Sequence, residues 1–337
     1  MTPRNIDGLI EKFYDSVQKH RLDEGKYCRW MWQNKENTRN LGSSEYGCAD
    51  AANILYTIGR FETDHAKREA AVKEMQSFQN PETGLFSEPT HHYLHSTAHV
   101  SAALQLFDAK PLYPFYELEK YKTKEGLYEL LEGLQWEENP WSQSHLGAGI
   151  YACFACTEQA SLEWQKWYFD WLWNEADPET GMWRKGCIAV PGKAPAYFSM
   201  AGTFHYMFNT EHARQPLRYP DKLIDCMIEM YDRDFNNDKS TFLKNCGFIQ
   251  VDWVFCLNRA TRQTPHRFEE AKDRIRDCAH KYITALENMD ENTNEGFNDL
   301  HALFGSVCCV AEIQAALPGE FESVYPLHLV LDRRPFI

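Results

Sequence analysis

Residues 80–107 have the sequence NPETGLFSEPTHHYLHSTAHVSAALQLF, and this stretch decides the fold. Pro81 and Gly84 predict a tight turn. Four histidines follow the turn within nine residues: His91, His92, His95 and His99. The small and apolar residues that come next predict a helix that is buried nearly all round. We therefore expect a turn, a histidine-rich loop and a buried helix, in that order.

The same turn recurs as DPETGMW at residues 177–183, 97 residues after its first copy. Six segments rich in small and apolar residues recur along the chain at about half of that interval. They span residues 45–59, 93–107, 144–157, 196–208, 246–260 and 299–317. More charged, amphipathic segments precede them and begin near Ile6, Asp64, Tyr116, Ser161, Pro220 and His266. The period predicts six helical hairpins, each with a polar helix and a buried helix.

Six such hairpins predict an all-α fold, an (α/α)6 barrel or toroid in which the polar helices surround the buried ones. Gly, Ala, Ser and Cys in the buried segments fit helices that converge on one axis. An open helical solenoid is the rival architecture. Because both ends of the chain look like ordinary repeats without polar caps, we favour closure and a single domain over residues 1–337.

The bulk composition limits the partners. A net charge of −14 and a pI near 5.4 argue against nucleic acid and anionic membranes. No apolar run reaches the roughly 20 residues that span a bilayer, and no secretory leader is evident at the start of the chain. Most of the eleven cysteines lie in apolar helical segments, as reduced core thiols do. We expect a cytoplasmic protein with a small-molecule or oligosaccharide substrate and no cofactor; the oligomeric state stays open.

The loops that lead into the buried helices are long and rich in turn-forming residues, as in residues 80–93 and 177–197. Binding and catalytic groups concentrate on such loops. The positive ends of the buried helix dipoles lie at the same ends. We therefore expect an axial pocket at the amino ends of the buried helices.

Three aspartates are the candidate catalytic groups. Asp252 lies among apolar residues in IQVDWVF, where a charge needs a partner or an altered pKa. Asp50, in GCADAAN, is either a catalytic carboxylate or a group that bonds the start of its helix. Asp299 is either catalytic or an N-cap.

The candidate substrate-binding groups are polar or aromatic residues at the same ends of the buried helices. They are His91, His92, His95, His99, His145, His205, His301, Tyr46, Trp141, Trp183, Trp253, Gln250 and Glu88. Aromatic walls with a few convergent polar groups are typical of ligand pockets. His95 and His99 have helical metal-ligand spacing, but residue 96 is Ser where a metalloprotease helix has Glu. We expect hydrogen bonding to substrate at these histidines, and no metal.

The hairpin layout with PETG turns before buried helices resembles the α/α-toroid superfamily. One branch holds six-hairpin glycosidases, including unsaturated glucuronyl hydrolases, with related sugar lyases and epimerases. The other holds terpene cyclases and the β subunits of protein prenyltransferases. The isoprenoid branch matches less well, because a DxDD motif is missing. In addition, Asp252 and Cys256 are four residues apart where the zinc-binding pair of prenyltransferases is two apart.

The sugar branch implies aspartates on inner helices as acid and base, and Asp252 and Asp50 match that role by position. The leading hypothesis is a glycoside hydrolase, including the unsaturated-glucuronyl-hydrolase type, in which a uronate could be held by Arg184 or Lys185. An inverting mechanism would need carboxyl groups roughly 6.5–9.5 Å apart. The alternatives are an isoprenoid enzyme of the terpene cyclase or prenyltransferase kind, and a non-catalytic helical binding scaffold.

Overall fold

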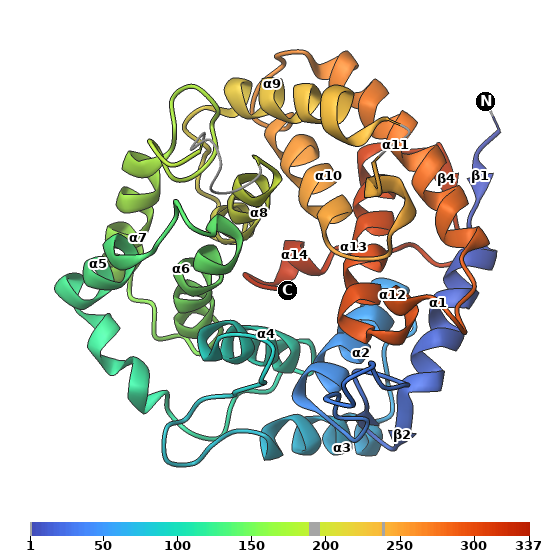
Figure 1. Ribbon diagram of the computed structural model, residues 1–337. Coiled ribbons are helices and arrows are strands. Elements are labelled where there is room, and N and C mark those ends of the chain that lie inside the picture. Colours follow the sequence, from blue (N-terminus) through green and yellow to red (C-terminus); the bar gives the residue numbers. More distant parts are fainter. Residues whose placement is uncertain (1, 189–195, 238–239) are drawn as a thin grey trace. The chain divides into compact units, whose positions relative to one another are not determined.

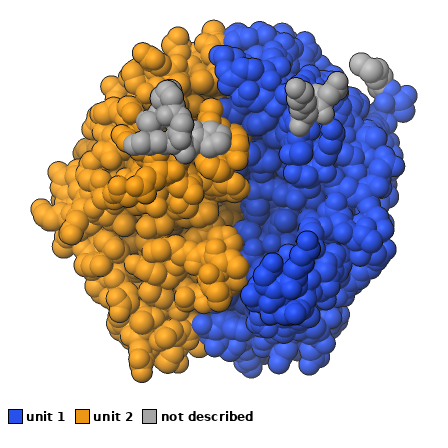
Figure 2. Space-filling view, viewed as in Figure 1, with its two compact units in different colours: residues 1–78, 228–258, 267–330 blue, residues 79–227, 259–266, 331–337 orange. Residues whose placement is uncertain are grey.

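The computed structural model describes residues 2–188, 196–237 and 240–337. Within them the chain is all-α, apart from strands of two or three residues (Figure 1). It divides into two compact units (Figure 2). Unit 1 comprises Met1–Phe78, Ile228–Asn258 and Arg267–Val330; unit 2 comprises Gln79–Met227, Arg259–His266 and Leu331–Ile337.

Unit 2 is built around three buried helices. They are α4 (Tyr93–Leu106), α6 (Pro140–Cys156) and α8 (Ala196–His212). α6 packs against both α4 and α8, and the three lie side by side in Figure 1. The remaining elements are η1 (Tyr116–Lys122), α5 (Lys124–Gly133), α7 (Leu162–Glu175), most of α9 (Pro220–Met230) and most of the short α14 (Val330–Arg333). Polar and buried helices alternate along this unit, as the sequence predicts.

The small residues of the buried helices allow close approach. At Gly147, in the middle of α6, a Cβ atom would lie 2.0 Å from the hydroxyl oxygen of Tyr206 on α8. Tyr168 of α7 donates a hydrogen bond of 2.9 Å to the carbonyl oxygen of the same glycine. A larger residue at this position would therefore force neighbouring side chains apart.

The two PETG turns have the same geometry. In each, the glycine N–H donates to the carbonyl oxygen of the first turn residue at 2.8 Å, Gly84 to Asn80 and Gly181 to Asp177. Both glycines have positive φ angles, 77° and 72°, which favour a residue without a Cβ atom. The side chains of Asn80 and Asp177 accept further backbone N–H groups within their turns. The sequence repeat thus corresponds to a structural repeat, although residues 189–195 of the second loop lie outside the described residues.

Unit 1 has a comparable plan. Its helical elements are α1 (Asp7–His20), α2 (Glu45–Thr57), α3 (His65–Ser77), η2 (Tyr231–Phe235), η3 (Phe242–Lys244), most of α10 (Ile249–Ala260), α11 (Phe268–Asn288), α12 (Glu295–Asn298) and α13 (Leu300–Ala316). The buried helices α2 and α13 pack against each other. The strands β1 (Arg4–Asn5) and β4 (Phe321–Glu322) pair in parallel, and β2 (Arg21–Asp23) pairs with β3 (Lys26–Tyr27) in antiparallel fashion.

Helix positions and apolar faces agree with the sequence pattern. The apolar face of α11 that the spacing predicts, Ile275, Cys278, Tyr282 and Leu286, is fully buried. Asp64 and Ser161, where two polar segments were expected to begin, are the N-caps of α3 and α7. The eleven cysteines are free thiols, and most are buried, as expected. Within the described residues, no helix combines the length and the apolar character needed to cross a membrane.

Candidate functional site

Asp50 and His301 form a buried carboxylate–imidazole pair in unit 1. Asp50 lies on α2 and His301 in the first turn of α13. The Nδ1 atom of His301 is 3.1 Å from Oδ1 of Asp50, and Asp50 has no exposed surface. An ionised Asp50 accepts a hydrogen bond from the Nδ1–H of His301, and in that tautomer of the neutral imidazole Nε2 carries the lone pair. Such an imidazole can accept a proton from a bound molecule at Nε2.

Aromatic rings surround this pair. The His301 ring meets Tyr46 edge-on with ring centroids 5.0 Å apart, and Phe248 with centroids 4.6 Å apart. The Arg29 guanidinium lies over the Tyr46 ring at 5.1 Å and over the Trp30 ring at 4.4 Å. Tyr46 and Asp50 are one helical turn apart and therefore share a face of α2. Aromatic rings of unit 1 thus lie beside His301, and the Arg29 guanidinium lies over one of them.

Asp299 has a structural position. Its Oδ1 accepts the N–H of His301 at 3.1 Å, which caps α13. The same carboxylate forms a two-pronged ion pair with Arg29, at 2.9 Å to Nε and 3.1 Å to Nη2. A carboxylate that caps a helix and forms two hydrogen bonds to a guanidinium is fixed in place. We therefore assign Asp299 to positioning the start of α13, next to the pair, and no longer to catalysis.

Asp252 is a second buried aspartate of unit 1. It is 1% exposed, and neither of its side-chain oxygens has a hydrogen-bond partner among the described residues. Burial raises the pKa of this carboxyl well above its ordinary value, because the charged form is poorly solvated there. Its backbone N–H bonds to the carbonyl oxygen of Phe248 at 3.0 Å, so Asp252 lies one helical turn beyond the residue that contacts His301.

Two further predicted groups of α10 serve the core. Trp253 is fully buried and stacks on Tyr231 with ring centroids 4.7 Å apart. The Gln250 amide donates to the carbonyl oxygens of Phe242 and Asn245, which ties the preceding loop to the helix. Both side chains are thus engaged in packing, and we remove them from the candidate substrate-binding set.

Unit 2 gathers histidines from three helices and one loop. We call His91, His95, His145 and His205 the imidazole row. Successive ring centroids are 4.5 Å apart for His91 and His95, 4.4 Å for His95 and His145, and 4.5 Å for His145 and His205. His99 lies one turn beyond His95, at 6.2 Å. Five of the candidate histidines, His91, His95, His99, His145 and His205, thus lie close together in unit 2.

One end of the imidazole row contacts Glu88. A carboxylate oxygen of Glu88 accepts the Thr90 N–H at 2.8 Å and lies 3.5 Å from Nδ1 of His91. The Thr90 hydroxyl is 2.8 Å from the same nitrogen. His92 turns away: it is exposed, and its Nδ1 accepts the Leu94 N–H as the N-cap of α4. Adjacent histidines thus have different roles, and only His91 belongs to the row.

The other end of the row is buried. The Ser144 hydroxyl donates to the carbonyl oxygen of Trp141 at 2.6 Å and lies 2.7 Å from Nδ1 of His205. Because that hydroxyl proton is already used, His205 donates from Nδ1 and does not act as a base toward Ser144. Burial, and then the nearby His91, lowers the pKa of His205 to about 3. This Ser–His contact is therefore not a nucleophile–base pair.

The two predicted tryptophans of unit 2 differ. Trp183 is buried, and its indole N–H donates to the carbonyl oxygen of Leu172 at 2.7 Å, so it packs α7 against the turn. Trp141 is half-buried and lies 5.7 Å from the Phe198 ring. Only Trp141 remains a candidate stacking surface.

The expected cations for a uronate are already engaged. Arg184 pairs with Glu132 and, at 2.6 Å, with Glu175. Lys185 pairs with Glu175 at 2.9 Å. Because carboxylates of the chain occupy both cations, neither is assigned to an acidic sugar.

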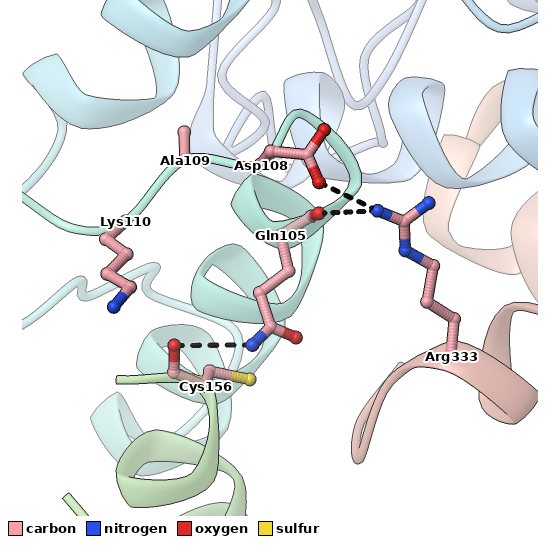
Figure 3. Close-up of a pocket in the computed structure, with 6 residues that line it drawn as sticks. All are labelled: Gln105, Asp108, Ala109, Lys110, Cys156 and Arg333. Atoms are coloured by element: carbon pink, nitrogen blue, oxygen red, sulfur yellow. Dashed lines mark hydrogen bonds and ion pairs between the residues drawn. The ribbon is translucent and has the colours of Figure 1, made fainter. Parts of the chain in front are cut away.

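A cavity of about 310 Å³ lies elsewhere in unit 2 (Figure 3). Its lining residues are Gln105, Asp108, Ala109, Lys110, Cys156 and Arg333. Arg333 donates to the Asp108 carboxylate at 3.0 Å and to the Gln105 carbonyl oxygen at 3.4 Å. Gln105 is ten residues beyond His95 on α4, about 15 Å along the helix. A cation at the carboxyl end of a helix offsets the helix dipole. We therefore assign Arg333, which lines this cavity, to stabilising the carboxyl end of α4.

Sequence reasoning missed several residues that the structure places beside the predicted ones. Phe248 contacts the His301 ring of the pair. Arg29 lies over the Tyr46 ring and binds Asp299, and Ser144 fixes His205. Asn53 shares a face of α2 with Asp50; it is fully buried, and its amide has no hydrogen bond among the described residues. The sequence did offer a signal for Arg29: it is the one cation in CRWMW, an aromatic-rich stretch that precedes α2.

Comparisons with protein families, with curated proteins and with solved structures found no match to this chain.

Proposed function

We propose that the chain is a carbohydrate-active enzyme, a glycoside hydrolase that works by acid–base catalysis in unit 1. The observation that carries this proposal is the contrast between two buried aspartates of the same unit. Asp252 has no hydrogen-bond partner and a raised pKa, whereas Asp50 is bonded to His301. Two carboxyl groups whose surroundings differ in this way suit an acid and a base.

In this proposal Asp252 is the general acid. A carboxyl group that stays protonated near neutral pH can donate to the glycosidic oxygen as the bond to the leaving group breaks. Burial supplies the raised pKa, since the charged form is poorly solvated there. The apolar surroundings of Asp252 lower the stability of the fold. The same surroundings raise its pKa and so suit it to donate a proton.

Asp50 and His301 form the base. The carboxylate holds the imidazole by Nδ1, so Nε2 can take a proton from the attacking water. Positive charge that develops on the ring is stabilised by the Asp50 carboxylate. Asp299 and Arg29 keep the first turn of α13, and hence His301, in place.

The surroundings favour a neutral sugar. Tyr46 and Phe248 present aromatic rings beside His301, and aromatic walls with few polar groups are typical of ligand pockets. The Asn53 amide supplies a donor and an acceptor for hydroxyl groups. Arg29 is bound to Asp299, so its guanidinium is not reserved for a uronate carboxylate.

The closed (α/α)6 toroid is part of the proposal. Side-by-side packing of α4, α6 and α8 within unit 2, and of α2 and α13 within unit 1, supports it. A crystal form in which the polar and buried helices form an open superhelix would remove the toroid.

The test is hydrolysis of a panel of neutral 4-nitrophenyl glycosides, with an unsaturated uronide as a separate arm. We expect at least one neutral glycoside to be hydrolysed, and Asp252→Asn to lower kcat by at least about 10²-fold with the circular dichroism spectrum unchanged. Asp170→Asn, at an exposed site on α7, is the matched control. Equal turnover by Asp252→Asn and the parent would remove Asp252 as the acid, and no turnover of any probe would favour a binding scaffold.

A further inference from the structure

The cavity at the carboxyl ends of α4 and α6 has no part in the proposed acid–base chemistry. Its volume of about 310 Å³ lies at the lower end of the range of small-molecule pockets, about 300–1,000 Å³. All six lining residues belong to unit 2, and three of them are charged: Asp108, Lys110 and Arg333 (Figure 3). The cavity therefore suits a small ligand that carries charge.

Two ion pairs involve residues that line the cavity. Arg333 pairs with Asp108 at 3.0 Å, and Lys110 pairs with Glu158 at 2.7 Å. Between 43% and 78% of each of these four side chains is exposed. Ion pairs as exposed as these contribute little to stability, so a ligand of matching charge can exchange for either partner.

The ion pairs of Arg184 and Lys185 are different. Both of these cations bind Glu175, whose side chain is only 13% exposed. A ligand would have to displace a largely buried carboxylate there, whereas at the cavity it meets groups that water already reaches. Exposure therefore makes the cavity cations available for exchange and leaves Arg184 and Lys185 to the fold.

Two acidic residues occupy equivalent backbone positions at this end of unit 2. Asp108 follows the C-cap of α4 and Glu158 follows the C-cap of α6, with φ angles of 58° and 60°. Gly is the usual residue at this position, and a carboxylate there faces the negative end of the helix dipole. Local structure thus does not account for the acidic residues. We attribute them to charge at the cavity: Asp108 lines it, and Glu158 directs Lys110, which also lines it.

Carbonyl oxygens at the helix ends add acceptors. The Gln105 amide donates to the Cys156 carbonyl oxygen at 3.3 Å, and Arg333 donates to the Gln105 carbonyl oxygen at 3.4 Å. Both distances exceed the range of about 2.7–3.2 Å that is typical of N–H···O hydrogen bonds. An ammonium group has three donors and a charge that the carboxyl end of a helix favours. The cavity thus offers acceptors for an ammonium as well as cations for a carboxylate.

We propose that this cavity binds a free α-amino acid in its zwitterionic form. The carboxylate of the ligand binds Arg333 and Lys110, and its ammonium binds Asp108 and the carbonyl oxygens of the helix ends. A purely anionic ligand would meet Asp108 and the negative ends of two helix dipoles, and a purely cationic one would meet two cations. A zwitterion exchanges for both partners of the Arg333–Asp108 pair at once, so each charge keeps an opposite one beside it.

Thermal unfolding of the full chain in the presence of each standard L-amino acid tests this site, because a ligand that binds the folded state raises Tm. We expect a rise in Tm with at least one of them. Calorimetry then compares that amino acid with the amine that lacks its carboxylate and with the acid that lacks its ammonium. Each analogue should bind at least about ten-fold more weakly.

Two variants locate the site. Arg333→Gln and Asp108→Asn should each lower the affinity for the amino acid by at least about ten-fold. Asn adopts a positive φ readily, so Asp108→Asn keeps the backbone at the end of α4. Arg233→Gln and Asp170→Asn are the matched controls, because Arg233 and Asp170 are also exposed and ion-paired but do not line the cavity. Neither control should change the affinity.

Absence of a Tm increase with every amino acid would overturn the site. Equal affinity for the amino acid and either analogue would overturn the zwitterion, and unchanged affinity in both Arg333→Gln and Asp108→Asn would overturn the cavity as its location. Asp252→Asn should bind the amino acid as the parent does, so failure of the proposed activity and failure of this site are separate results.

Discussion

Replacing Gly147 by Ala tests the packing between α6 and α8. The added Cβ atom would lie 2.0 Å from the Tyr206 hydroxyl oxygen and 2.9 Å from its Cζ atom. Tyr206 cannot swing aside easily, because Trp136, Trp171 and Trp183 surround its ring at 5.5 Å, 6.2 Å and 5.8 Å. Overpacking of this kind costs about 1–3 kcal/mol, and the better helix propensity of Ala returns up to about 1 kcal/mol.

We therefore expect Gly147→Ala to lower the free energy of unfolding by about 1–2 kcal/mol, measured by urea denaturation at pH 7. The Tyr206 hydroxyl has no hydrogen-bond partner among the described residues, so Tyr206→Phe should be nearly neutral. The double variant should recover most of the loss, because the atom nearest to the new Cβ is then absent. Unchanged stability of Gly147→Ala, or additive effects in the double variant, would refute the reasoning.

A matched control is available in α1. A Cβ atom at Gly8 would meet nothing within 4 Å. Gly8→Ala should therefore raise the free energy of unfolding, by up to about 1 kcal/mol. Opposite signs at the two glycines would separate steric contact from helix propensity.

The other predictions concern titration and turns. Because the pKa of Asp252 is raised in the folded state, the free energy of unfolding of the parent should fall as pH rises above about 4. The stability difference between Asp252→Asn and the parent should therefore grow by about 1.4 kcal/mol per pH unit in that range. Free energies of unfolding that change with pH in the same way for both proteins would contradict this. The lowered pKa of His205 should reduce the free energy of unfolding of the parent by the same amount per pH unit as pH falls from about 6.5 towards 3. His205→Gln should lack this contribution to the pH dependence. Asn80→Ala should lose about 1 kcal/mol in urea, since its side chain accepts the N–H of Glu82 at 2.8 Å; no loss would argue against the turn.

Local patterns predicted the helices well, because apolar spacing and capping residues act within a few turns of chain. Asp64 and Ser161 mark helix starts in the sequence and in the structure alike. Partners far apart in the chain were not predictable. Asp299 pairs with Arg29, 270 residues away, and this contact changes its assignment from catalysis to positioning.

Side-chain direction was the second limit. Trp183 follows a predicted turn beside the expected pocket, yet its indole points to α7, because the carbonyl oxygen of Leu172 accepts its N–H. His91 and His92 are neighbours in sequence, but one joins the imidazole row and the other caps α4. Composition and spacing predicted a cluster of histidines. The order of the rings in the imidazole row depends on how α4, α6 and α8 pack, which local sequence does not specify.

The central claim is that Asp252 is a neutral carboxylic acid at the pH where the protein works. Infrared difference spectroscopy of the parent minus Asp252→Asn at pH 7 measures this directly. The account predicts a carbonyl band of a protonated, weakly hydrogen-bonded carboxylic acid that is missing from the variant. A difference spectrum that contains only carboxylate bands at pH 7 would contradict it.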